Sequence, residues 1–558
     1  MNGITIMLIA IAVLGGGYLL YGRWLAKLWG VDPKAKTPAY EMEDGVDYTP
    51  AEPGVVFGHQ FASIAGAGPI NGPIQAAIFG WVPVLLWVLV GGLFFGAVQD
   101  FVAMFASVRN KGRTIGYIIE LYIGKIGKKL FTLFVWLFSI LVVAAFADVV
   151  ANTFNGFAAT PELSLANGQV ATTSMLFIAA AVGLGVMLKK CRFGKGVNTV
   201  VALGLLVLCI AVGMTLPMYV STASWHLIVF AYIAIASIVP VWALLQPRDY
   251  LNSYLLVAMI AAALVGVVVA NPEMNLNAFN GFTVNGQHMF PILFVTIACG
   301  AVSGFHALVS SGTASKQIKN EKHMLPVSFG AMLLESLLAV VALIAVGAIS
   351  SGGVVASGTP AVVFATAISS FLGKIGIPED LAFTLINLAV SAFALTSLDS
   401  VARVGRLSFQ EFFLDSSMNE ENMSPVLKLL TNKYTATVIT LAMAYALAKA
   451  GYANIWPLFG SANQLLSALA LIACAVYLKR TNRKGWMLWL PMGVMLAVTL
   501  TALGMSIVGK FGGIFAGTTA NLGGDLLQGC FAVALFALGV MVAVQGIRKL
   551  WGKKADNA

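Results

Sequence analysis

Four carboxylates stand within or at the edge of long apolar runs: Asp100, Asp148, Glu335 and Asp399. Keeping one of them charged at the centre of a lipid bilayer costs at least about 2.5–3.5 kcal/mol, so each should be neutral, paired or functional. Glu335 is the deepest and has leucines on both sides, where desolvation favours the neutral acid. Such a group can take a proton from one side of a membrane and release it to the other. We therefore predict Glu335 as a proton-coupling residue and Asp148 as the second candidate.

The other two carboxylates have basic residues nearby in the sequence. Arg109 follows Asp100, and Arg403 and Arg406 follow Asp399. For Asp100 and Asp399 we therefore predict structural ion pairs with these arginines.

Residues 57–77 (FGHQFASIAGAGPINGPIQAA) form the densest polar cluster inside an apolar run. Pro69 and Pro73 have no backbone N–H, and the glycines between them let the chain open without a side-chain clash. This pattern predicts a discontinuous helix whose second half starts near residues 70–74, where free amides and the helix dipole can hold a carboxylate. A proline kink that only shapes the bundle is the alternative. The side chains that favour a binding site are Asn71, Gln75, His59 and Gln60.

Two further segments break an apolar run. In 235–252, Pro240 stands mid-run, although a single proline is common in such helices, and Arg248 with Asp249 is explained equally by an interfacial ion pair. In 299–318, hydroxyl groups surround several glycines and offer the oxygen ligands that a sodium ion prefers. Close helix packing with a satisfied interior histidine explains the same pattern, and both interpretations stay open. The side chains concerned are Ser303, His306, Ser310, Ser311 and Thr313.

The composition predicts that membrane-spanning helices hold these residues in place. Of 558 residues, 59% are hydrophobic and 10% charged, whereas a soluble domain carries about a quarter charged residues. An ordinary soluble enzyme is excluded, and we predict an all-α polytopic membrane protein. Residues 360–373 are short and polar enough to be re-entrant or surface-lying. The fifteen predicted spans are 3–28, 57–80, 82–108, 130–152, 172–188, 196–217, 226–246, 250–270, 289–313, 324–349, 381–400, 433–450, 455–478, 486–508 and 526–547.

The basic residues support this division. All but Lys374, Lys449 and Lys510 fall in alternate loops, which predicts an outside N-terminus and a cytoplasmic C-terminus. The net charge of +10 then reflects the basic residues that orient the protein in the membrane, and attraction to anionic lipid makes a minor contribution. Nucleic-acid binding is excluded. Residues 3–28 lack a cleavage site and are predicted to be a retained helix. The five scattered cysteines suggest neither disulfides nor a metal site.

The order of the spans predicts an inverted repeat. If 57–80 is core helix 1, then 226–246 is the sixth core helix and runs in the opposite direction, so two broken helices would face each other at mid-membrane. We predict repeats over about 57–217 and 226–400 within a transporter core at 57–432. An extra helix and loop (1–56) precede this core, and further helices (433–558) follow it.

Five motifs resemble those of the carbon starvation protein A family of bacterial inner-membrane transporters: GHQFASIAGAGPINGP, LLQPRDYLN, GAVSGFHALVSSGTASKQI, TSLDSVARVGR and IWPLFGSANQLL. The resemblance implies uptake of pyruvate or peptides with proton coupling, and a LeuT-like fold of the amino acid, polyamine and organocation superfamily. Some family members have considerably longer chains.

The resemblance also implies site residues. Substrate would lie between core helices 1 and 6, at Gly66, Gly68, Asn71, Gly72, Ser237 and Trp242, with Gln75 beside them. A cation, where one is used, would lie at Ala65, Ser310, Ser311 and Thr313. His59 and His306 join Glu335 and Asp148 as candidates for proton coupling.

Other classes of protein fit the sequence less well. A channel would also contain broken helices, but no selectivity-filter motif is repeated here. A membrane enzyme is disfavoured because HExxH, GxSxG, a Walker A loop and CxxC are all absent, and no cofactor is predicted. The expected partners are a small carboxylate or peptide, a proton or sodium ion, and lipid. The sequence does not distinguish pyruvate from a peptide, or one oligomeric state from another.

Overall fold

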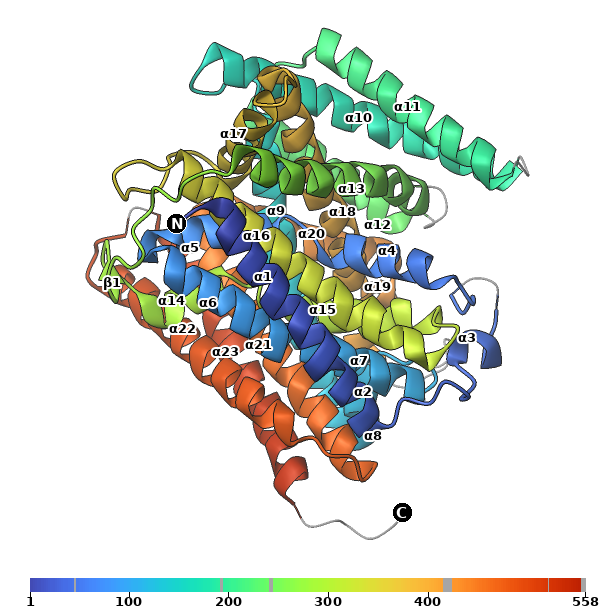
Figure 1. Ribbon diagram of the computed structural model, residues 1–558. Coiled ribbons are helices and arrows are strands. Elements are labelled where there is room, and N and C mark those ends of the chain that lie inside the picture. The colour runs from blue at the N-terminus through green and yellow to red at the C-terminus, as the bar shows by residue number, and fades with distance from the viewer. Residues whose placement is uncertain (45–46, 191–193, 240–243, 415–423, 520, 553–558) are drawn as a thin grey trace. The chain divides into compact units, whose positions relative to one another are not determined.

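The computed structural model describes residues 1–44, 47–190, 194–239, 244–414, 424–519 and 521–552 and is built almost entirely from helices (Figure 1). Among the described residues, 11 helices are long and apolar enough to cross a membrane. Each overlaps one of the predicted spans. The other four predicted spans, 57–80, 226–246, 289–313 and 433–450, are interrupted or shorter helices. The all-α membrane fold is thus confirmed.

The chain divides into two compact units that each combine distant segments. Unit 1 comprises Met1–Thr5, Ser139–Leu276 and Val341–Ile455, and unit 2 comprises Ile6–Phe138, Asn277–Val340 and Trp456–Ala558. The predicted boundaries near 57 and 433 do not coincide with this division and stay predictions.

Unit 2 contains most of the short and interrupted helices. In chain order its elements are α1 (Gly3–Gly17), η1 (Tyr18–Gly22), α2 (Arg23–Trp29), α3 (Pro38–Glu41), α4 (Pro53–Ile64), α5 (Gly68–Ala76), η2 (Ala77–Phe79), α6 (Trp81–Gly91), η3 (Gly92–Gly96), α7 (Ala97–Arg109), α8 (Ile115–Tyr122), β1 (Thr283–Val284), β2 (Gln287–His288), α14 (Met289–Thr296), α15 (Gly304–Gly312), η5 (Ala314–Lys316), η6 (Glu321–His323), η7 (Leu325–Gly330), η9 (Trp486–Leu488), α22 (Trp489–Phe515) and α23 (Leu522–Trp551).

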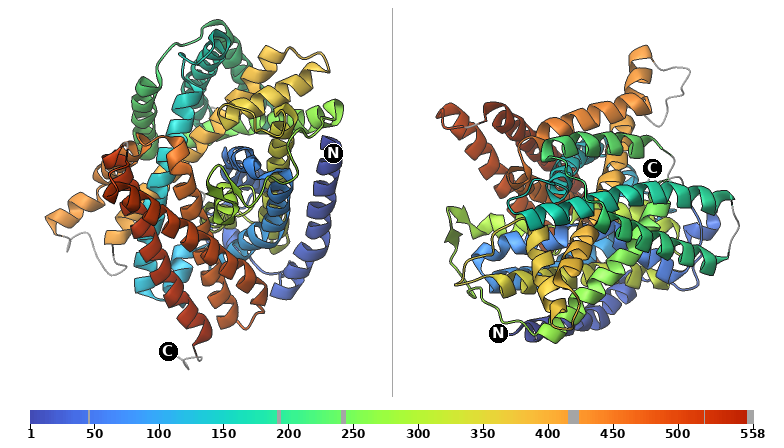
Figure 2. Two further views of the ribbon diagram at one scale, coloured as in Figure 1. Left: turned by 90° about the vertical axis from the view of Figure 1, so that its left-hand side faces the viewer. Right: turned by 90° about the horizontal axis from the view of Figure 1, so that it is seen from above.

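Unit 1 contains longer helices. They are α10 (Pro161–Lys190), α11 (Lys195–Thr215), α12 (Thr222–Ile238), α13 (Leu245–Ala270), α17 (Pro360–Gly373), α18 (Glu379–Phe413), α19 (Pro425–Thr431) and α20 (Lys433–Ala448). Four helices have residues in both units: α1, whose first residues belong to unit 1, α9 (Lys125–Thr153), α16 (Ala331–Ile349) and α21 (Tyr452–Arg480). Within unit 1, α10 and α11 form a hairpin that lies side by side in Figure 1 and in the right-hand view of Figure 2.

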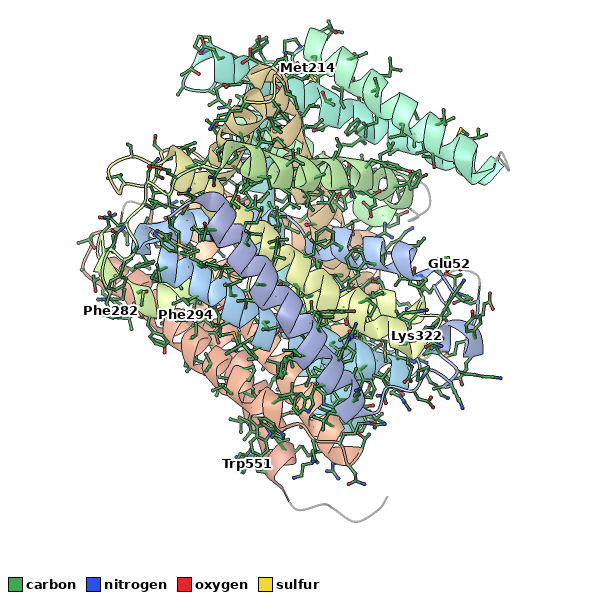
Figure 3. All side chains as sticks on the ribbon, viewed as in Figure 1. Glu52, Met214, Phe282, Phe294, Lys322 and Trp551 are labelled. Atoms are coloured by element: carbon green, nitrogen blue, oxygen red, sulfur yellow. The ribbon has the colours of Figure 1, made fainter. Side chains whose placement is uncertain are left out.

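Two discontinuous helices run antiparallel inside unit 2. The first is α4 followed by α5, and the second is α14 followed by α15. Because α5 packs against α14 while α4 packs against α15, the two discontinuous helices run in opposite directions. Figure 3 shows the same relation at the ends of the pair, with Glu52 before α4 on one side of unit 2 and Phe282 before α14 on the other.

The predicted broken span 226–246 lies in unit 1. We expected 226–246 to be the broken partner of 57–80. In the structure that stretch contains α12 and the start of α13, and Pro240 lies outside the described residues. The two stretches belong to different units, so their pairing stays a prediction. Within unit 2, α4 and α5 pack against 289–312, which we had predicted as the eighth core span.

A short hairpin fixes where α14 begins. Strands β1 and β2 pair antiparallel, with Thr283 opposite His288. Asn285 and Gly286 between them both have positive φ, 50° and 74°. An Asn-Gly pair favours the tight turn that such a hairpin needs, so the local sequence explains this turn.

Candidate functional site

The first break separates α4 from α5 at Ala65–Ala67. The backbone leaves the helix at Ala65, where ψ is 65°, and the Gly66 amide donates to the carbonyl of Ile64 at 2.8 Å. We expected free amides near residues 70–74. That expectation is wrong, because α5 already begins at Gly68 and the Asn71 amide donates to the Ala67 carbonyl at 2.9 Å.

Asn71 lies on α5 just after the break. Its side chain is 1% exposed, and neither its amide nitrogen nor its amide oxygen has a hydrogen-bond partner among the described residues. Gln75 donates to the backbone carbonyl of Asn71 at 3.3 Å. A buried amide without partners is costly, so Asn71 is available to bind a polar ligand.

The second break, residues 297–303, is held by side chains from α7 and α21. Asn463 on α21 accepts from the Phe305 amide at 3.1 Å and donates to the Ser303 hydroxyl at 3.0 Å. Gln99 on α7 donates to the Ser303 carbonyl at 2.6 Å, and Gln464 donates to the Phe294 carbonyl at 2.6 Å. Groups freed by this break are therefore capped by protein.

The two breaks lie in close contact. A Cβ added to Gly68 would stand 2.5 Å from the sulfur of Cys299, and one added to Gly72 would stand 2.8 Å from the carbonyl oxygen of Thr296. Atoms in proteins do not approach so closely. At Gly72 the neighbour is backbone, so this position requires glycine, whereas at Gly68 the Cys299 side chain would have to move. The predicted site residues Gly68, Asn71 and Gly72 are thus brought together with the second break.

A histidine lies between two carboxylates beside the second break. His306 Nδ1 on α15 is 3.2 Å from Asp100 Oδ2 on α7, and His306 Nε2 is 3.3 Å from Glu335 Oε2 on α16. All three side chains are fully buried. The predicted pair of Asp100 with Arg109 is wrong, since Arg109 instead binds the buried Glu321 at 2.7 Å.

The charge of this cluster is unbalanced. If His306 is protonated, one carboxylate is neutralised and one negative charge is left over. A buried charge without a partner is strongly unfavourable, so the cluster needs one further proton or another cation. Neither nitrogen of His306 and neither oxygen of Glu335 has a hydrogen-bond partner among the described residues.

The hydroxyl groups predicted for a cation are mostly engaged with protein. Ser310 accepts from Gln60 on α4 at 2.7 Å. Ser311 donates to the Ala307 carbonyl at 2.7 Å, and Thr313 donates to the Val309 carbonyl at 3.1 Å. Of the other predicted residues in unit 2, Ala65 ends α4 and is fully buried, and His59 accepts through its backbone carbonyl from Ser63 at 2.7 Å.

Unit 1 contains the remaining predicted residues. Asp148 Oδ1 lies 2.8 Å from His226 Nε2, and its other oxygen accepts from the Tyr452 amide at 2.6 Å. Ser237 is buried near the end of α12, and Trp242 lies outside the described residues.

Asp399 forms an ion pair with an arginine, as predicted, but the arginine is neither Arg403 nor Arg406. Asp399 binds Arg248 of α13, which also pairs with Asp249 at 3.1 Å. Arg403 and Arg406 donate instead to backbone carbonyls at the end of α12, where the helix dipole favours positive charge.

Sequence reasoning assigned no role to several residues that organise the site. They are Gln99, Cys299, Asn463 and Gln464. Three of them are amides inside apolar helices, and intramembrane polar side chains are a signal that could have found them.

Comparison with known proteins finds one matching family and relatives that are named as transporters. Residues 2–357 and 348–502 match the carbon starvation protein CstA family. The "Peptide transporter CstA" of Bacillus subtilis is 32% identical over 98% of this chain and 97% of that protein. The "Pyruvate/proton symporter BtsT" of Escherichia coli is 30% identical over 91% of this chain and 82% of that protein.

Among solved structures, MhsT in complex with L-phenylalanine is similar at a TM-score of 0.44 and 15% identity, over 89% of this chain and 98% of that one. The match to the family covers most of the chain. The chain therefore belongs to the carbon starvation protein CstA family.

Proposed function

We propose that this chain is a secondary active transporter that takes up a small carboxylate, either pyruvate or a short peptide. Membership of the CstA family and the names of the two relatives support this function. The structural observation that carries it is the pair of antiparallel broken helices, with the buried, unpartnered amide of Asn71 on α5 just after the first break. Discontinuous helices of this kind form substrate and ion sites in transporters.

We propose that the substrate carboxylate binds at the first break. Asn71 would donate its amide to the carboxylate, with backbone groups near Gly66 and Gly68 beside it. Because Gly72 packs against the backbone at Thr296, the two breaks must separate to admit substrate. The second break already has its polar groups capped by Asn463 and Gln464, which favours the first break as the binding surface.

We propose that a proton drives uptake and that the cluster of Asp100, His306 and Glu335 carries it. The support is the extra negative charge in a fully buried group, together with the proton-coupled relative. Binding of one proton neutralises the cluster, and a change in its surroundings as the breaks move would release that proton on the other side.

Uptake into proteoliposomes tests this function. Labelled pyruvate and a labelled dipeptide are offered in counterflow, and then with an imposed proton or sodium gradient. A carrier exchanges the unaltered substrate, a channel cannot accumulate it by exchange, and an enzyme changes it. Lack of exchange with both substrates would contradict the transporter. Uptake that needs sodium and ignores a pH gradient would move the coupling site to Ala65, Ser310, Ser311 and Thr313.

We further propose a bacterial inner-membrane location with the N-terminus outside. The loops at 153–171, 218–225 and 271–288 carry no Lys or Arg, so single cysteines placed there should label from outside. Outside labelling of 189–195 would contradict this orientation.

A further inference from the structure

Three side chains beside the second break carry three different metal-binding atoms. The sulfur of Cys299, an imidazole nitrogen of His306 and a carboxylate oxygen of Glu335 all lie within 4.8 Å of one another. The His306 nitrogens and Glu335 oxygens are buried and have no hydrogen-bond partner among the described residues. Their contacts are the ion-pair contacts of His306 with Asp100 at 3.2 Å and with Glu335 at 3.3 Å, and the geometry points to a further ligand between Cys299, His306 and Glu335.

The spacing fits a tetrahedral ion. Metal–nitrogen and metal–oxygen distances of zinc correspond to roughly 3.3–3.5 Å between two ligands on one tetrahedral edge. His306 Nε2 and Glu335 Oε2 are 3.3 Å apart. An edge to sulfur requires roughly 3.5–3.6 Å, and the Cys299 sulfur lies within 4.8 Å of the other two ligand atoms.

Asp100 adds the support that such a site requires. A histidine that binds a metal usually donates its other ring nitrogen to a carboxylate, which fixes the ring and raises its affinity for the metal. Asp100 Oδ2 lies 3.2 Å from His306 Nδ1, on the side of the ring away from Glu335.

We propose that Cys299, His306 and Glu335 bind a divalent transition-metal ion of zinc's class, and that this ion inhibits transport. Thiolate and imidazole ligands select zinc-like ions over magnesium, calcium or sodium. The Cys299 thiolate and the Glu335 carboxylate balance the two positive charges beside a neutral imidazole, and Asp100 behind the ring would then be neutral through a proton. Three protein ligands leave a fourth position open, as in sites that exchange a ligand.

Inhibition follows from where the ligands lie and rests on the proposed function. Cys299 belongs to the break itself, His306 to α15 and Glu335 to α16. An ion bound to all three would hold the second break to α15 and α16, and would oppose the movement of this break that we propose for proton release. It would also occupy the residues that we propose for coupling.

Cobalt binding to the purified full chain tests the metal site without any transport assay. Because Cys530 is exposed, all proteins carry Cys530→Ser. Co²⁺ should bind saturably, give tetrahedral absorption with a thiolate-to-cobalt charge-transfer band, and be displaced by Zn²⁺. Cys299→Ser should lose the band, and Asp100→Asn should weaken binding roughly 10- to 100-fold.

The matched control is Cys474→Ser, which alters a buried cysteine of α21 in the same unit and should keep the band. Survival of the band in Cys299→Ser, or no saturable cobalt binding, would overturn the site. For inhibition, uptake is measured against Zn²⁺ and normalised to each variant's own zinc-free rate. Cys299→Ser should raise the half-inhibitory zinc concentration at least about tenfold, and zinc binding without inhibition would overturn the inhibitory role.

Discussion

Two histidines of this protein lie beside buried carboxylates, and the two groups differ in charge and in exposure. In unit 1, His226 faces one carboxylate, Asp148, which also accepts a backbone amide, and the His226 side chain is 16% exposed. In unit 2, His306 faces two carboxylates, Asp100 and Glu335, and none of the three side chains is exposed.

His226 and Asp148 can balance each other's charge, whereas the cluster of Asp100, His306 and Glu335 requires a further cation. One imidazole and one carboxylate can be neutral together, and partial exposure lets water stabilise either charge state. Two buried carboxylates around one imidazole cannot both be balanced by it. We therefore expect ion exchange at the unit 2 cluster and a structural role for the pair in unit 1.

The largest expected effect is that of Glu335→Gln. Without the second carboxylate the unit 2 cluster has no place for the additional proton, so uptake should no longer be concentrative and the accumulation ratio should fall to about one. Counterflow should continue, because it needs no net proton movement. Measured in proteoliposomes, normal proton-driven accumulation in this variant would remove the distinction between the two histidine groups.

Asn71→Ala should have the next largest effect. Loss of one hydrogen bond to a charged group costs about 1.5–3 kcal/mol, which corresponds to roughly 10- to 100-fold weaker substrate binding. The measurement is substrate affinity from equilibrium binding, with the melting temperature as a control for folding. Unchanged affinity at normal expression would exclude this amide from the site.

Gly72→Ala should lower stability by about 1–3 kcal/mol, since its Cβ would stand 2.8 Å from the backbone carbonyl of Thr296, which ends α14 just before the second break. Thermal unfolding in detergent measures this loss. The control is Gly58→Ala on α4, where a Cβ meets nothing within 4 Å. Equal stability of both variants would show that the two breaks do not pack as closely as described.

The smallest effect is expected for His226→Gln. The variant removes one partly exposed ion pair in unit 1, which should cost about 1 kcal/mol of stability and leave the accumulation ratio unchanged. If accumulation is lost while the protein stays folded, then Asp148 and His226 take part in coupling and unit 1 contains the proton site.

Much of the fold could be predicted because membrane helices leave a strong local signal. Eleven of the predicted spans match helices long enough to cross a membrane, since a bilayer demands about 20 apolar residues in each. The break at 57–77 was also predictable, because proline removes a backbone donor wherever it stands. The burial of Glu335 followed from its leucine neighbours in the same way.

The tertiary structure decided which of these elements meet. Sequence order predicted that 226–246 faces the first break, which stays a prediction, and only the packing in unit 2 shows that 289–312 runs beside α4 and α5. Asp100 has Arg109 nearby in sequence and His306, more than two hundred residues away, in space. Local sequence patterns indicate the free-energy cost of placing each residue in lipid. The partners of a buried charge are set by long-range packing, and a single sequence does not show which distant residues pack together.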